Sequence, residues 1–310
     1  MSVDILLDSL RAGTKANYST YLKKWITFCA EKKVDLFHPR TSEVLLFFSS
    51  LFQLGYSYGQ LCSTRSAVSL LLTHGQNDQT WGKLPVVKRY MKGLFERRAV
   101  FPKVYTTWDV GVVFAYIRTL PHPAVQDLRT LSHVLALLLG LLSGGQRCQT
   151  IHQIELGDLT VVSPKFLMIP IMSVIKQTRP GHHMLPLKFK PYLPDERLCV
   201  VTVLTYYLKA TMYCRGTSRK LFVSYQKPHG PVSRDTIARW CKNVLSLAGI
   251  DISQFCSHSS RSAATSMAKA KGMSLGKIIT YAGWSNARTF ASYYDKPIEV
   301  VETTFQDILL

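Results

Sequence analysis

Apolar residues recur at helical spacing through the first hundred residues of the chain. Over residues 14–33 one apolar stripe alternates with paired lysines, which is typical of a helix with one buried face. The stripe consists of Tyr18, Tyr21, Leu22, Trp25, Ile26, Phe28 and Cys29, and we interpret its aromatic residues as core rather than as a base-stacking surface. Further helices are predicted after Thr41, from about 57 to 73 and from about 85 to 98. Residues 1–100 are therefore expected to form an all-helical domain.

After a short linker at residues 101–106, the pattern changes to a mixture of helices and short strands. Two helices are predicted up to Leu142, and the second is apolar enough to be buried. It ends at Gly144-Gly145, which is expected to place Arg147 in a tight turn beside the core. Three strand-like runs and two more helices follow, at residues 159–162, 166–175, 183–189, 198–213 and 233–248. We expect a second domain over residues 107–310, with a small antiparallel sheet.

Several residue types that can handle a phosphodiester lie close together near the C-terminal end. His258 and Arg261 are three residues apart on a predicted helix, so both side chains are expected on one face, where they could grip one anion. A second short helix and a turn lead to Trp284. Tyr293 and Tyr294 follow nine and ten residues later, which is near enough for a tyrosine to fold back towards the same site.

These residues resemble the signature of a known family. His258-x-x-Arg261, then Trp284 and then a tyrosine, is similar to the C-terminal motif of the tyrosine recombinases, which are DNA strand-exchange enzymes. The closer resemblance is to the recombinases of eukaryotic DIRS-like and Ngaro-like retrotransposons. It rests on Gly145-Gln146-Arg147-Cys148-Gln149-Thr150, Lys176-Gln177-Thr178-Arg179-Pro180-Gly181, and Trp284-Ser285-Asn286 followed by Thr289-Phe290. Each motif is weak alone, but together they stand in the family's order at plausible separations.

The resemblance implies a mainly helical fold with a small antiparallel sheet. It would be a two-domain, C-shaped clamp around duplex DNA, built from an all-helical core-binding domain and a tyrosine-recombinase catalytic domain. In the active site, the resemblance makes Lys176 the general acid, gives His258 a part in proton transfer, and makes Trp284 a support for the phosphate. Arg147 and Arg261 suit the charge that phosphoryl transfer places on non-bridging oxygens, because each guanidinium can donate two hydrogen bonds. A tyrosine can store the phosphodiester energy covalently, so no metal or other cofactor is expected.

Two adjacent tyrosines compete for the role of nucleophile. Counting nine residues from Trp284, as in several bacterial and phage members, gives Tyr293. In the DIRS-like relatives the Thr-Phe pair is followed by two residues, an aromatic residue and then the tyrosine, which favours Tyr294. We predict that Tyr294 is the nucleophile, with Tyr293 as the alternative.

One position departs from the pattern of the family. Tyrosine recombinases commonly carry an acidic residue three positions after the first arginine, and this chain has Thr150 there. Glu155 or Asp158 could supply the missing carboxylate from the following turn. The sequence leaves this choice open.

The chain is strongly basic. Its 38 Lys and Arg against 19 Asp and Glu leave a net charge of +19, and the excess occurs in both predicted domains. Nucleic acid is the expected partner of such a charge, although a ribosomal or membrane-surface protein would share it. The densest basic stretch comprises Lys88, Arg89, Lys92, Arg97, Arg98 and Lys103. We predict that it contacts the DNA backbone, with a solvated helix face as the alternative.

The seven cysteines are dispersed and contain no Cys-x-x-Cys pair, which indicates a reducing, intracellular compartment. No secretory signal is visible, and the most apolar run, residues 134–142, is too short to span a bilayer, so no membrane partner is expected. The DIRS-like resemblance implies a nuclear location. His182-His183, Cys256 and His258 fit no familiar zinc-ligand spacing, and we expect no metal site.

The resemblance implies a site-specific recombinase or integrase. It would cut and rejoin double-stranded DNA through a 3′-phosphotyrosine, integrate a circular mobile element, and work as a homotetramer on two DNA sites, with no small-molecule substrate. One alternative is a type IB topoisomerase, which shares the chemistry but relaxes supercoils. The other is a catalytically silent DNA-binding protein derived from a recombinase.

The last residues of the chain predict an additional helix. Its apolar stripe would consist of Val301, Phe305, Ile308 and Leu309, which is more apolar surface than a free terminus should expose. In related recombinases the end of the chain docks on a neighbouring protomer, so truncation after Lys296 is expected to impair assembly on DNA. Packing of the stripe on its own domain is the alternative.

Overall fold

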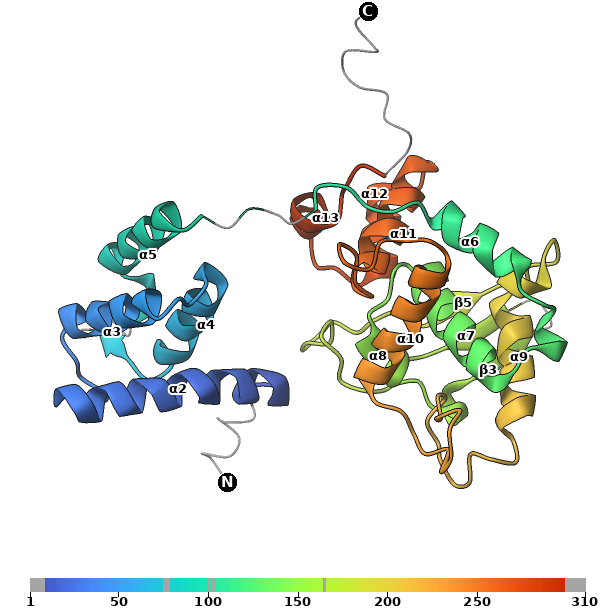
Figure 1. Cartoon of the computed structure of the whole chain (residues 1–310), viewed down its shortest axis with the longest axis horizontal. Coiled ribbons are helices and arrows are strands. Elements are labelled where there is room, and N and C mark those ends of the chain that lie inside the picture. The colour runs from blue at the N-terminus through green and yellow to red at the C-terminus, as the bar shows by residue number, and fades with distance from the viewer. Residues whose placement is uncertain (1–8, 75–78, 100, 102–103, 164–165, 299–310) are drawn as a thin grey trace, which may run out of the picture. The chain divides into compact units, whose positions relative to one another are not determined.

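The computed structural model describes the chain except for residues 1–8, 75–78, 100, 102–103, 164–165 and 299–310. The chain divides into two compact units, Met1–Pro102 and Lys103–Leu310. Figure 1 labels the elements of both units. The helix predicted for the C-terminal tail and the predicted DNA contact at Lys103 lie outside the described residues.

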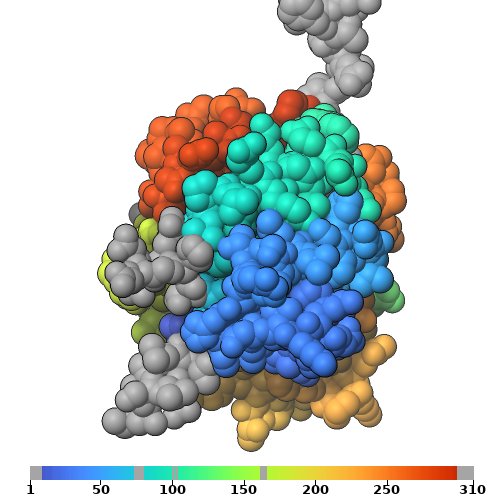
Figure 2. Space-filling view, turned by 90° about the vertical axis from the view of Figure 1, so that its left-hand side faces the viewer, coloured from blue at the N-terminus to red at the C-terminus, as the bar shows by residue number. Residues whose placement is uncertain are grey.

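The described residues of the first unit form four α-helices around an aromatic core. They are α2 (Ala12–Lys32), α3 (Thr41–Gln53), α4 (Tyr58–Val68) and α5 (Pro85–Arg97), and in Figure 2 their atoms form one continuous body. Trp25 is fully buried and packs edge-on against Phe47, while its Nε1 donates to the carbonyl of Leu36 at 3.1 Å. Trp25, Phe28 and Cys29 of the stripe belong to this core and Tyr21 is buried, as predicted, whereas Tyr18 is only partly buried. Ile26 is an exception, because it lies half exposed on the outer side of the helix.

The expectation of an all-helical first domain is wrong in one detail. Helix α4 ends at Val68, and strand β1 (Thr73–His74) pairs antiparallel with β2 (Gln79–Thr80). Because the two strands are antiparallel, the direction of the chain reverses between α4 and α5.

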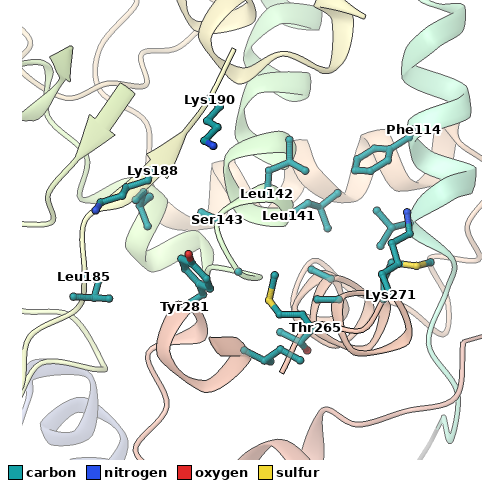
Figure 3. A pocket seen from close by; sticks show the side chains of 18 of the residues that line it. Phe114, Leu141, Leu142, Ser143, Leu185, Lys188, Lys190, Thr265, Lys271 and Tyr281 are labelled. Atoms are coloured by element: carbon teal, nitrogen blue, oxygen red, sulfur yellow. The ribbon is translucent and has the colours of Figure 1, made fainter. Parts of the chain in front are cut away.

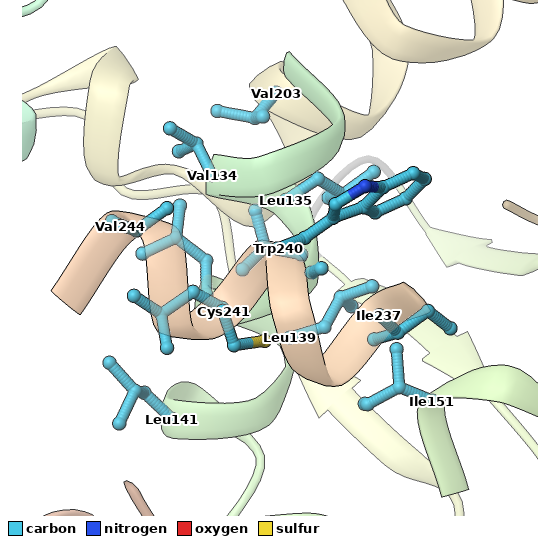
Figure 4. Close-up of a cluster of buried hydrophobic side chains, with 14 of the residues drawn as sticks. Val134, Leu135, Leu139, Leu141, Ile151, Val203, Ile237, Trp240, Cys241 and Val244 are labelled. Carbon is cyan, nitrogen blue, oxygen red and sulfur yellow. The ribbon is translucent and has the colours of Figure 1, made fainter. Parts of the chain in front are cut away.

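The second unit is organised around the buried helix α7 (Leu128–Leu142), which is covered over nearly its whole length. Helices α9 (Val200–Thr211), α10 (Arg234–Leu247) and α11 (Ser259–Ala270) pack against it. Figure 4 shows Val134, Leu135 and Leu139 of α7 among the side chains of α9 and α10. The other α-helices in the described part of this unit are α6 (Val110–Thr119), α8 (Cys148–His152), α12 (Leu275–Ala282) and α13 (Ala287–Tyr293). An apolar helix surrounded by others is the expected result of apolar residues on all its faces.

The unit also contains the predicted small antiparallel sheet. Its strands are β3 (Thr160–Ser163), β4 (Phe166–Ile169) and β5 (Leu187–Phe189), in the order β3-β4-β5. The two later strands are shorter than predicted, because Pro170 directly follows β4 and Pro186 directly precedes β5. Proline has no N–H for the ladder and interrupts strand pairing. Lys176 therefore lies in the connection between β4 and β5, whereas the sequence pattern predicts it at the end of a strand.

The fold is mainly helical with a small antiparallel sheet, as predicted from the sequence. Within the described part of the chain, no helix is long and apolar enough to cross a membrane.

Candidate active site

Arg261 joins three segments of the second unit. It lies in the first turn of α11, is only 1% exposed, and donates from Nη1 to the carbonyl of Gly145 at 2.7 Å and from Nη2 to the carbonyl of Ala282. Its guanidinium carbon lies 4.5 Å from the centre of the Trp284 ring. A guanidinium has five N–H donors, so these two bonds orient Arg261 and leave donors for a ligand. Nε in particular is buried and has no partner among the described residues.

The turn after α7 packs closely on Arg261 and Tyr281, and its two glycines make this possible. Gly145 has a φ of +70°, and a Cβ there would lie 3.1 Å from the Cα of Arg261. Gly144 has a φ of +93°, and a Cβ there would lie 2.8 Å from the Cβ of Tyr281. Both positions favour glycine for conformation and for space. The turn places Arg147 as N-cap of α8, in the tight turn that the sequence predicted.

Tyr294 faces this site, whereas Tyr293 faces solvent. Helix α13 ends at Tyr293, and Tyr294 is its C-cap with a φ of −127°. The chain thus leaves the helix between the two tyrosines. Tyr294 is 9% exposed, its hydroxyl lies 3.2 Å from Nε2 of His258, and its ring packs on Trp284 with centroids 4.7 Å apart. Tyr293 is 71% exposed.

The electrostatics of the site show that its cations lie close together. Partial desolvation of the His258 ring, which still reaches solvent on one side, lowers its pKa, and the charges of Arg147, Arg261 and Lys176 lower it further. Burial and then the charge of Arg147 lower the pKa of Arg261, while Tyr294 raises it. Among the described residues, no carboxylate forms an ion pair with any of these four groups. The folded chain therefore holds several cationic groups near one another without a paired carboxylate among the described residues, which favours the binding of an anion.

The segment that carries Lys176 is anchored to this site by its neighbour. Lys176 is exposed, but Gln177 is buried and its Cγ lies 3.2 Å from where a Cβ of Gly283 would be. Gly283 directly precedes Trp284 in the chain. The structure thus brings Arg147, Lys176, His258, Arg261, Trp284 and Tyr294 together and leaves out Tyr293.

Comparison with known proteins identifies the family. Residues 123–298, more than half of the chain, match the model described as "Phage integrase family". The chain belongs to the phage integrase family, the tyrosine recombinases. This membership supports an enzyme of DNA cleavage and religation. None of the curated proteins matches the chain significantly in sequence.

Solved structures share the recombinase fold with this chain. The Tn1549 transposon integrase in complex with transposon right end DNA matches at 13% identity and a TM-score of 0.60, over 97% of this chain and 92% of that one. The XerH site-specific recombinase bound to palindromic difH substrate matches at 13% identity and a TM-score of 0.58, over 88% and 74%. A lambda integrase dimer bound to a COC′ core site matches at 15% identity and a TM-score of 0.56, over 98% and 97%. At these identities the likeness concerns the fold.

Neither of the two carboxylates predicted as a substitute for the common acidic residue pairs with Arg147 in the described part of the chain. Thr150 is fully buried, and its hydroxyl has no partner among the described residues. Glu155 instead lies 3.1 Å from Nζ of Lys220, and Asp158 accepts from the N–H of Glu155 at 3.2 Å. Both acids are engaged elsewhere, so neither supplies the missing partner of Arg147.

The basic stretch predicted to contact DNA divides into two kinds of residue. Lys88, Arg89, Lys92 and Arg97 are exposed on α5. Arg98 is exposed as well, but it donates to the carbonyls of Tyr56 at 3.2 Å and Phe52 at 3.3 Å, and its guanidinium carbon lies 4.1 Å from the centre of the Phe52 ring. Arg98 therefore ties the end of α5 to the end of α3. Its guanidinium is engaged within the unit, whereas the sequence pattern predicts that the whole stretch contacts the DNA backbone.

A pocket of about 500 Å³ lies apart from the candidate catalytic residues. Figure 3 shows its mixed lining of apolar side chains, such as Leu142, Leu185 and Tyr281, and of lysines. The lysines are Lys188, Lys190 and Lys271. Within the described residues, no three His, Cys, Asp or Glu side chains form a group that could hold a metal ion.

Sequence reasoning did not single out two further residues near the site. Gln177 belongs to the motif that contains Lys176, and its position directly after that lysine could have indicated that it lies near the site. Ser266 is one of several small residues on α11, and nothing in its local sequence distinguishes it.

Proposed function

We propose that this protein cuts and rejoins DNA site-specifically through a covalent 3′-phosphotyrosine, with Tyr294 as the nucleophile. The observation that carries the proposal is the position of Tyr294: its hydroxyl lies 3.2 Å from Nε2 of His258, and its ring centre lies 5.5 Å from the guanidinium carbon of the buried Arg261. A phenol with a proton acceptor on one side and a cationic anion site on the other has what an attack on a phosphodiester needs.

The residues divide the work of the strand cleavage. The Tyr294 oxygen attacks the scissile phosphorus, and the bond to the 5′-oxygen of the next nucleotide breaks. His258, as neutral imidazole, accepts the phenol proton, and Lys176 donates a proton to the leaving 5′-oxygen. Arg147 and Arg261 stabilise the charge on the non-bridging oxygens. Rejoining reverses these steps when a 5′-hydroxyl attacks the phosphotyrosine, so no water and no energy-rich cofactor is consumed.

We propose further that the exposed cations of α5 contact DNA phosphates. Four of them lie on one element at the end of the first unit, and phosphate contacts by Lys and Arg supply most of the sequence-independent affinity for DNA. Specificity for a particular site would come from base contacts and DNA shape.

The biological setting that we propose is the integration of a circular element of the DIRS-like class in the nucleus, by a tetramer on two DNA sites. The motifs around Arg147, Lys176 and Trp284 support it. The fold is also similar to that of the Tn1549 integrase solved with circular intermediate DNA, at 11% identity and a TM-score of 0.52. A lambda integrase tetramer bound to a Holliday junction, at 14% identity and a TM-score of 0.52, has the same fold.

A suicide duplex made from the ends of the element tests the proposed function. The duplex carries a nick beside the cleavage site, so that the leaving fragment diffuses away and the covalent adduct accumulates. We expect a protein–DNA adduct that survives denaturation. A protein that binds the duplex but forms no adduct would be a silent DNA-binding relative.

The topology of the products separates a recombinase from a type IB topoisomerase. A recombinase joins strands of two duplexes, whereas a topoisomerase relaxes a supercoiled circle without a partner duplex. Incubation of a supercoiled plasmid carrying two sites should therefore give recombinant products. Relaxed circles alone would support the topoisomerase.

A further inference from the structure

The backbone on both sides of Tyr294 is fastened to α11 by one buried side chain. Ser266 is 4% exposed, and its Oγ donates to the carbonyl of Tyr294 at 2.9 Å. The same Oγ accepts from the N–H of Lys296 at 3.1 Å. Ser266 thus binds the residue of the proposed nucleophile and the residue two positions later.

This contact matters because Tyr294 stands where regular structure ends. The carbonyls at the end of a helix lack partners within the helix, and the Tyr294 carbonyl would be one of these orphan groups. Its N–H still bonds to the carbonyl of Phe290 at 2.8 Å. Helix α13 has only 7 residues, however, so it fixes the chain beyond Tyr293 weakly. The direction in which the phenol points therefore depends on what holds the chain after Tyr293.

The helix that supplies Ser266 also carries the partners of the phenol. His258 is the N-cap of α11, and Arg261 lies in its first turn. Ser266 therefore attaches the backbone of Tyr294 to the same helix that positions His258 and Arg261. A second link, the ion pair between Lys269 and Asp295, is partly exposed to solvent. Exposed pairs contribute little, so of these two links from α11 the buried serine is expected to contribute more. The segment is also held by bonds from the N–H of Asp295 to Phe290 and from Nζ of Lys296 to Val104, but neither of these comes from α11.

We infer that Ser266 is a positioning residue for the nucleophile, which holds the Tyr294 hydroxyl in line with the scissile phosphate. The inference rests on the proposed function. Displacement of reacting atoms by about 1 Å can cost on the order of 100-fold in rate, and loss of a backbone anchor next to the nucleophile permits such a displacement.

The test compares Ser266→Ala with a matched serine on the same helix. Ser260 is also buried on α11, but its Oγ has no hydrogen-bond partner among the described residues. Adduct formation on the suicide duplex is followed in a single turnover, with the rate constant and the final amplitude recorded separately. We expect Ser266→Ala to cleave about 10- to 100-fold more slowly at full amplitude and with unchanged DNA affinity. Ser260→Ala should cleave at the wild-type rate.

Two further measurements separate positioning from other effects. A duplex with sulfur in place of the bridging 5′-oxygen needs no proton on its leaving group, so it should relieve the defect of Lys176→Ala but not that of Ser266→Ala. Ser266→Cys keeps a weak donor in nearly the same volume and should be faster than Ser266→Ala. It also serves as the test variant if Ser266→Ala does not fold.

The outcomes distinguish this inference from the proposed function. Wild-type cleavage by Ser266→Ala, an equal defect in Ser260→Ala, or a loss of amplitude at an unchanged rate would each overturn the positioning role and leave the chemistry standing. A wild-type protein that forms no adduct, or an adduct that persists in Tyr294→Phe, would overturn the proposed function itself.

Discussion

The hydroxyl of Tyr294 lies 3.2 Å from Nε2 of His258, whereas the side chain of the preceding Tyr293 is 71% exposed. The two tyrosines are therefore not equivalent. We expect Tyr294→Phe to abolish the covalent adduct while DNA binding persists, because the variant lacks only the attacking oxygen. Tyr293→Phe should keep adduct formation. Denaturing gels of the suicide-duplex reaction measure both, and an inverted pattern would assign the nucleophile to Tyr293.

The two arginines should respond differently to replacement by lysine. Arg147→Lys is expected to lower the cleavage rate by about 10²–10³-fold, since an ammonium loses the forked geometry that binds two oxygens. Its thermal stability should change little, because Arg147 is engaged in no ion pair among the described residues. Arg261→Lys should lose the same catalysis and also about 1–3 kcal/mol of unfolding free energy, because the carbonyls of Gly145 and Ala282 lose a buried donor.

Single-turnover rates and urea unfolding of both arginine variants check this prediction. DNA affinity should stay close to that of the wild type, because it depends on many phosphate contacts. Cleavage at the wild-type rate by either lysine variant would show that the arginine it replaces does not contact the scissile phosphate.

Variants of α5 should separate DNA binding from stability. Replacement of Lys88, Arg89 or Lys92 by Ala is expected to weaken DNA binding and to reduce the slope of log K against log salt by about one unit for each phosphate that the variant no longer neutralises. Arg98→Ala should instead lower the melting temperature, because it removes the hydrogen bonds to Tyr56 and Phe52. Filter binding over a salt series and thermal melts distinguish the two effects.

His133 should make stability fall in mild acid. Its ring is buried against Tyr225 and Trp240 and its Nε2 has no partner among the described residues, so burial, helped by the charge of Arg129, lowers its pKa from 6.5 to about 4. The unfolded chain binds this proton more readily than the folded chain. The contribution of the neutral His133 ring to the free energy of unfolding is thus complete above pH 6.5. As the pH falls from 6.5 towards 4, the free energy of unfolding decreases by about 3 kcal/mol in total.

Urea unfolding between pH 7 and pH 4 measures the effect of His133. The variant His133→Phe provides the comparison, since it places an aromatic ring that cannot titrate at the same position. A stability that falls equally steeply in this variant would show that another group is responsible.

The predicted tail can be tested with a boundary that the structure refines. Thr107 donates its N–H to the carbonyl of Pro297 at 2.8 Å and bridges to Ile298. Truncation after Ile298 therefore removes the tail and keeps this hydrogen bond, whereas truncation after Lys296 would break it. We expect the shortened protein to fold and to bind DNA weakly but to assemble poorly on it.

Crosslinking on two-site DNA measures the assembly of the truncated protein, and a thermal melt provides the control. Tetramers at the wild-type level would contradict docking on a neighbouring protomer. A lowered melting temperature would instead indicate that the tail packs on its own domain.

The sequence by itself determined the features that depend on neighbouring residues. The helical period of the apolar residues predicted the helices of both units, and the glycines after Leu142 predicted the turn that carries Arg147. The order and spacing of short motifs indicated the family and named the candidate site residues. The helical periods and the turn can be read from the sequence because each lies within a short stretch of chain, and the motifs because their residue types and order are visible without the fold.

Only the tertiary structure decided which residues meet across long separations. Two adjacent tyrosines have the same chemistry. Because α13 ends between them, the hydroxyl of Tyr294 lies next to His258, while the side chain of Tyr293 is exposed to solvent. Glu155 was a plausible partner for Arg147 until the fold paired it with Lys220. Ser266 acquires a role only when the chain after Tyr293 returns to α11. Such contacts depend on how helices pack, because the packing of whole elements decides which side chains become neighbours.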